Sequence, residues 1–114
     1  MSLEYEFHAE MQLTNGTWRA MRMHAGYIDD LSSKTGVDWP SWHPGFPPDV
    51  SQEIYTGLMH WGNEFWLDYD EYVAHVRKYA PKGIAQAIEN AIFKPIEELK
   101  PTSDTKVRLI IVSG

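Results

Sequence analysis

The chain has 114 residues, carries a net charge of −6 at neutral pH and contains no cysteine. A chain of this length buries enough surface for one hydrophobic core, so we expect a single domain over residues 1–114. The lack of cysteine excludes a disulfide scaffold, a thiolate zinc site and a cysteine nucleophile. Phosphate binding needs clustered lysine and arginine, so we expect no nucleic-acid partner. There is no apolar run of about 18 residues and no signal-peptide core, so we expect a cytoplasmic protein without membrane contact.

Residues 3–13 alternate strictly between apolar and polar side chains, which predicts a strand with one face in the core. The pair Asn15-Gly16 follows and is the strongest short-range signal for a hairpin turn. We expect a return strand over 17–23 and a two-residue loop, which places Gln12 opposite Arg19. In that register the solvent face of the hairpin carries Glu4, Glu6, Glu10 and Arg19.

A short helical turn over 27–33 and a proline-rich loop over 37–48 come next, and the prolines exclude a helix or an inner strand there. Three helices are then expected. The first spans 52–62 with Ser51 as its N-cap, and the second begins at Asp68 or Asp70 and ends at Pro81. The third begins at Pro81, and Pro95 interrupts its apolar stripe, which predicts a kink or a break.

The last strand is expected over 106–112, with apolar residues on both faces. These elements predict an α+β fold of topology ββαααβ. A small mixed sheet, made of the N-terminal hairpin and the C-terminal strand, is covered on one face by about three helices. The right-handed crossover rule places the last strand beside the first and parallel to it, and an antiparallel placement is the alternative. This apolar strand is also a candidate for pairing across a homodimer.

Acidic residues and tryptophans share the middle of the chain. Residues 29–71 hold nine acidic residues, one basic residue and four of the five tryptophans. Aromatic side chains in acid-flanked loops suit the binding of a cationic or amphipathic protein partner. In the alternative reading, the tryptophans complete the core and the acids are solvated helix caps. The candidate partner-binding residues are Trp39, Trp42, His43, Phe46, Trp61 and Trp66.

Two histidine–carboxylate pairs at helical spacing suggest a second kind of site. His60 and Glu64 are four residues apart, as are Glu71 and His75, so each pair shares one face of a helix. Together the two pairs could hold a divalent metal. Ordinary pairing on a helix surface is the alternative. The acids of residues 68–71 are explained by a helix N-terminus, which favours negative charge.

We therefore expect a protein-binding or inhibitor-like interaction module that uses an acidic surface rich in tryptophan and proline and needs no cofactor. The first alternative is a small metal-dependent enzyme with the histidines and glutamates above lining a cleft. The second is a structural subunit that dimerises through the C-terminal strand. In size, acidity and tryptophan content the chain resembles nuclease inhibitors and immunity proteins, a likeness of composition that no residue motif carries.

Overall fold

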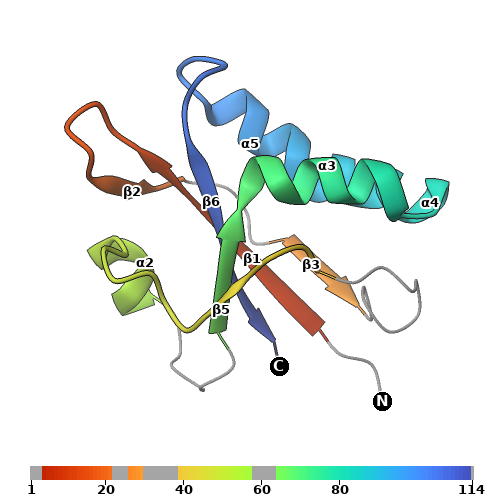
Figure 1. The fold of residues 1–114 in the computed structure, drawn as a ribbon, viewed down its shortest axis with the longest axis horizontal. Coiled ribbons are helices and arrows are strands. Elements are labelled where there is room, and N and C mark those ends of the chain that lie inside the picture. Colours follow the sequence, from red (N-terminus) through yellow and green to blue (C-terminus); the bar gives the residue numbers. More distant parts are fainter. Residues whose placement is uncertain (1–3, 22–25, 30–38, 58–63, 114) are drawn as a thin grey trace.

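The computed structural model describes residues 4–21, 26–29, 39–57 and 64–113. Its strands are β1 (Glu4–Gln12), β2 (Trp18–Ala20), β3 (Gly26–Asp29), β4 (His43–Pro44), β5 (Glu64–Asp68) and β6 (Val107–Ser113). They form one sheet in the order β2-β1-β6-β5-β4, and β3 also pairs with β1 (Figure 1). The described helical segments are α2 (Gln52–Gly57), α3 (Tyr69–Tyr79), α4 (Lys82–Ile88), the π-helical turn η1 (Glu89–Phe93) and α5 (Lys94–Leu99). The expected α+β class is confirmed, with strands at both ends of the chain and helices between them.

The hairpin forms where the sequence predicts it, but its register is shifted by one residue. The backbone N–H of Leu13 donates to Thr17 O at 2.8 Å, so the loop holds three residues instead of two. Gly16 adopts a φ of 88°, the left-handed conformation typical of such three-residue loops. Arg19 consequently pairs with Met11 and Trp18 pairs with Gln12. A one-residue shift moves each side chain of the return strand to the other face of the sheet.

The prediction of a helical turn over 27–33 is wrong for residues 27–29, because Gly26–Asp29 forms strand β3 along β1. Residues 30–33 lie outside the described part of the chain. Tyr27 and Ile28 favour extended backbone, since β-branched and aromatic residues pack well on a pleated surface. Strand β5 was not expected either. It continues directly into α3, so the acidic residue at its end serves as a helix cap.

The last strand lies next to the first, as expected, but it runs antiparallel to it. Strand β5 pairs with its other edge and is also antiparallel, so the sheet is antiparallel at each described pairing rather than mixed. The crossover rule does not apply, because it governs parallel neighbours only. Both edges of β6 are hydrogen-bonded within the chain. The strand therefore has no free edge for pairing with a second copy.

The helices begin and end close to the expected positions. Ser51 caps α2 by accepting the N–H of Ile54, and Asp68 caps α3 by accepting the N–H of Glu71 at 2.9 Å. Helix α2 is described to Gly57, and residues 58–62 of the expected helix lie outside the description. The interruption expected at Pro95 takes the form of a π-helical turn just before it, and the backbone stays helical on both sides of that turn. The segment divides into α4, η1 and α5, and the N–H of Lys94 bonds Glu89 O, five residues back.

The main core lies between one face of the sheet and the segments α3, α4, η1 and α5 (Figure 1). Alternate residues of the central strands point into it, including Phe7, Leu67, Leu109 and Ile111. The opposite face of the sheet carries Glu10, Arg108 and Ile110, all buried, beneath the segment that leads into α2. No helix in the described part of the chain is long and apolar enough to span a membrane.

Candidate functional site

Three ring contacts run along the β4 edge of the sheet and the segment that follows it. Trp42 packs edge-on against Phe65 at 5.5 Å between ring centres, and Phe46 packs edge-on against Tyr55 at 5.6 Å. His43 stacks on Trp66 at 4.3 Å with 26° between the ring planes. We call these six residues the aromatic edge. It contains four of the candidate partner-binding residues, namely Trp42, His43, Phe46 and Trp66.

Local sequence holds the aromatic edge in place. Strand β4 is only two residues long, and His43 and Pro44 pair with Trp66 and Phe65 of β5. Gly45 then takes a φ of 77°, and its N–H donates to Glu64 O at 2.8 Å. Prolines before and after this turn restrict the backbone further. The segment that carries Trp42, His43 and Phe46 is therefore held against β5 with little backbone freedom.

The tryptophans of the middle segment do not share one environment. Trp42 leaves 52% of its surface exposed, whereas Trp39 is half-buried and packs against the core. The ring of Trp39 stacks on Tyr72 at 5.4 Å and contacts Phe7 and Phe65. Trp39 thus completes the core, as the alternative reading holds, while Trp42 stands at the surface, as the binding hypothesis requires. Trp61 lies outside the described residues.

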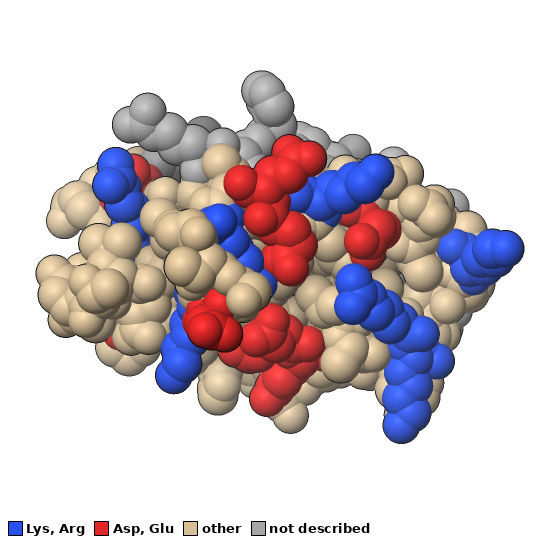
Figure 2. Space-filling model, turned by 90° about the horizontal axis from the view of Figure 1, so that it is seen from above, with Lys and Arg blue, Asp and Glu red and all other residues tan. Residues whose placement is uncertain are grey.

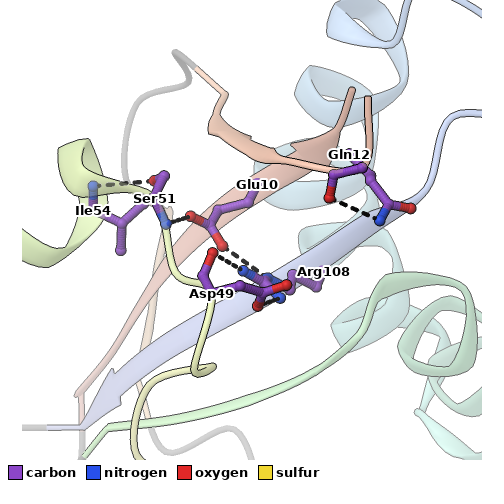
Figure 3. Close-up of polar contacts among 7 residues, drawn as sticks. Glu10, Gln12, Asp49, Ser51, Ile54 and Arg108 are labelled. Atoms are coloured by element: carbon purple, nitrogen blue, oxygen red, sulfur yellow. Dashed lines mark hydrogen bonds and ion pairs between the residues drawn. The ribbon is translucent and has the colours of Figure 1, made fainter. Parts of the chain in front are cut away.

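A buried ion network lies on the face of the sheet that points away from α3, α4 and α5. It holds the segment that follows β4 (Figure 3). The Arg108 Nε donates to the Glu10 carboxylate at 2.8 Å, and its terminal nitrogens donate to the side chain and the carbonyl of Asp49 at 2.7 and 3.2 Å. The second oxygen of Glu10 accepts the backbone N–H of Ser51 at 2.7 Å. A buried charge needs such partners to avoid a large desolvation penalty. The network therefore ties β1, β6 and the start of α2 together.

Two tryptophans complete the surroundings of Arg108. Its guanidinium carbon lies 3.9 Å from the ring centre of Trp18 and 5.6 Å from that of Trp66. The hydrogen bond from Arg108 is the largest cause that lowers the pKa of Asp49 below its usual 3.8, and burial opposes this effect. Since Trp66 also stacks on His43, the ion network and the aromatic edge share this residue. The aromatic edge thus adjoins the buried charged pair in the centre of the sheet.

Sequence reasoning missed this network. Glu10 and Arg19 were expected on the solvent face of the hairpin, but Glu10 is fully buried and Arg19 lies on the other face. The sequence feature that could have predicted the network is Arg108, a cationic residue within an otherwise apolar strand. Such a residue needs a buried acid on a neighbouring strand. Glu10, directly opposite it in the β1–β6 register, is that acid.

The candidate metal ligands do not converge. Glu64 is buried on β5, and strand alternation places it on the face of the sheet opposite α3. Glu71 is exposed in the first turn of α3, and His75 packs against the ring of Tyr79. His60 lies outside the described residues. Within the described part of the chain, no group of three histidines or carboxylates could hold a metal ion.

Acidic side chains gather on one face of the molecule, and other acids of residues 39–71 are exposed elsewhere on its surface. Seen from the side where α3, α4 and α5 lie, they occupy the middle of the molecule, and lysine and arginine side chains flank them (Figure 2). Asp68, Asp70 and Glu71 at the start of α3 are exposed. Asp49, in the segment after β4, leaves 63% of its side chain exposed while it holds Arg108. No lysine or arginine occurs in residues 39–57 or 64–76.

Comparison with protein-family models, with curated proteins and with solved structures finds no match. Function must therefore be inferred from the residues of this chain alone.

Proposed function

We propose that the chain is an interaction module that binds another protein through the aromatic edge, in the manner of an inhibitor and without a cofactor. The observation that carries this proposal is the exposure of Trp42 at the edge of the sheet. A large aromatic side chain that contacts Phe65 yet leaves half its surface in water is typical of the few residues that dominate protein interfaces. Because the chain has no cysteine, we place its activity in the reducing cytoplasm.

The stiffness of this edge supports the proposal. Binding loses free energy when side chains and loops must be ordered, and a surface that is already ordered avoids part of that loss. Trp42 directly precedes β4, whose backbone pairs with β5, and the Gly45 turn and the ion network hold the chain that follows. The exposed ring of Tyr55, on α2, adds a second aromatic contact beyond this turn.

Charge supports a partner with a basic surface. The exposed acids Asp49 and Glu53 lie in a segment that has no lysine or arginine, so a cationic partner would meet no like charge there. Attraction between exposed charges weakens with salt, because the Debye length falls as ionic strength rises. We therefore expect the partner to associate more slowly at high salt.

Matched bait proteins test this function. The wild-type chain, Trp42→Ala and Tyr79→Ala are used as baits in extracts of the native host. Tyr79 is the control because it is also a large exposed aromatic residue, at the far end of α3. We expect wild type and Tyr79→Ala to retain the same partner and Trp42→Ala to lose it. Equal recovery with all three baits, or recovery with none, contradicts the proposal.

A further inference from the structure

A small pocket lies between the hairpin and the end of α5. It has a volume of about 190 Å³ and is lined by Met11, Arg19, Ala20, Met21 and Leu99. An apolar cavity of about 150 Å³ is enough to hold a ring the size of benzene. Methionine side chains adapt easily to the shape of a bound apolar group. The pocket thus has room for a short apolar chain or a single ring.

The only charged residue of this lining is Arg19, and the hairpin register puts it there. Arg19 pairs directly with Met11, and paired residues of neighbouring strands project from the same face of the sheet. Its side chain is exposed, and among the described residues it forms no hydrogen bond, ion pair or ring contact. The guanidinium beside this apolar pocket thus has no protein partner among the described residues and is open to an anionic ligand.

We propose that this pocket binds a monocarboxylate with a short apolar tail. The tail would lie against Met11, Met21 and Leu99, and the carboxylate would accept two hydrogen bonds from the guanidinium of Arg19. A cationic ligand is repelled by Arg19, and a neutral one leaves the guanidinium without a partner. This site is separate from the aromatic edge, because β2 and β4 lie at opposite ends of the sheet.

Hexanoate is the probe for this proposal, and its neutral analogue hexanol is the matched control ligand. Binding is followed by titration of the methionine methyl resonances of the whole chain. We expect hexanoate to shift the Met11 and Met21 methyl signals in a saturable way. Hexanol should bind at least about fivefold more weakly, as befits the loss of one exposed ion pair.

Two variants separate the charge from the cavity. Arg19→Gln should weaken hexanoate binding about fivefold and leave hexanol binding unchanged. Leu99→Ser should weaken both ligands, because the apolar side chain that the tail contacts is lost. Arg77→Gln, at an exposed arginine on α3, should bind hexanoate like wild type. Absence of methyl shifts in wild type overturns the proposal, as does equal hexanoate affinity of wild type and Arg19→Gln.

Discussion

Arg108 lies over the ring of Trp18, with 3.9 Å between its guanidinium carbon and the ring centre. The two residues come from opposite ends of the chain, and the three-residue hairpin loop brings Trp18 to this face of the sheet. Stacking of this kind leaves the nitrogen atoms in the plane of the guanidinium free to donate. They donate to Glu10 and Asp49, so one buried cation joins the hairpin, the central strand and the segment before α2.

Removal of the Glu10 charge should destabilise the fold strongly. In Glu10→Gln, Arg108 remains buried and loses a charged partner. We expect the free energy of unfolding to fall by about 3 kcal/mol, as is usual when one half of a buried pair is removed. The control is Glu6→Gln, four residues earlier on β1 and on the same face of the strand, where the carboxylate is only part-buried beside His8. Urea unfolding should show a loss of about 1 kcal/mol or less for the control. Equal losses would mean that the Arg108–Glu10 contact adds little stability.

The Asp49–Arg108 bond should make stability depend on pH in the acidic range. Because Asp49 has a lower pKa in the folded chain than in the unfolded one, its ionised form favours folding. This contribution is complete above the unfolded value, near 3.8, and is lost as the pH falls through the folded value. Asp49→Asn should therefore be less stable than wild type at neutral pH. The difference should shrink at pH of about 2.5, as measured by urea unfolding. A difference that is constant with pH would contradict this prediction.

The sequence predicted those parts of the fold that depend on local patterns. Strict alternation identified β1, the caps Ser51 and Asp68 marked two helix starts, and Pro95 marked the interruption before α5. Register and strand partners depend on contacts between distant residues, and these were the parts missed. One extra loop residue reversed the faces of Trp18 and Arg19. The sequence does not predict strand β5, because the strand is short and Asp68 at its end fits a helix cap equally well.

The candidate site, like the fold, has a part that the local sequence predicts and a part that depends on tertiary contacts. Composition alone shows where tryptophans and acidic residues coincide, and it therefore predicted a binding site in the segment that forms much of the aromatic edge. It could not separate Trp39, which stacks on Tyr72 in the core, from Trp42, which stands exposed three residues later. Which of two nearby aromatic residues faces water depends on what packs against each of them. That information belongs to the tertiary structure.

Two buried tyrosines of α3 should respond differently to loss of the hydroxyl group. The Tyr72 hydroxyl is buried and has no hydrogen-bond partner in the described part of the chain, and burial raises the pKa of Tyr72 far above its usual value. Tyr72→Phe removes an unpaired polar group, so we expect stability to be unchanged or to rise by up to about 1 kcal/mol. Burial and then Glu97, which also forms a hydrogen bond with the hydroxyl, raise the pKa of Tyr69. Tyr69→Phe should therefore cost about 1 kcal/mol in thermal or urea unfolding. A larger loss for Tyr72→Phe than for Tyr69→Phe would show that the Tyr72 hydroxyl has a partner in solution.

Two glycine-to-alanine changes should alter stability in opposite directions. A Cβ added at Gly16 or at Gly83 meets no atom within 4 Å, so steric contact with neighbours plays no part in either variant. Gly16 has a φ of 88°, which L-residues adopt at a cost, and Gly16→Ala should lower the free energy of unfolding by about 1 kcal/mol. Gly83 lies in helix α4 without a positive φ, and Gly83→Ala should raise it by about 0.5–1 kcal/mol because the unfolded chain loses freedom. Gly16→Asn should cost less than Gly16→Ala, since asparagine tolerates this conformation better than alanine. Stabilisation by Gly16→Ala would contradict the three-residue loop, and with it the register that brings Trp18 to Arg108.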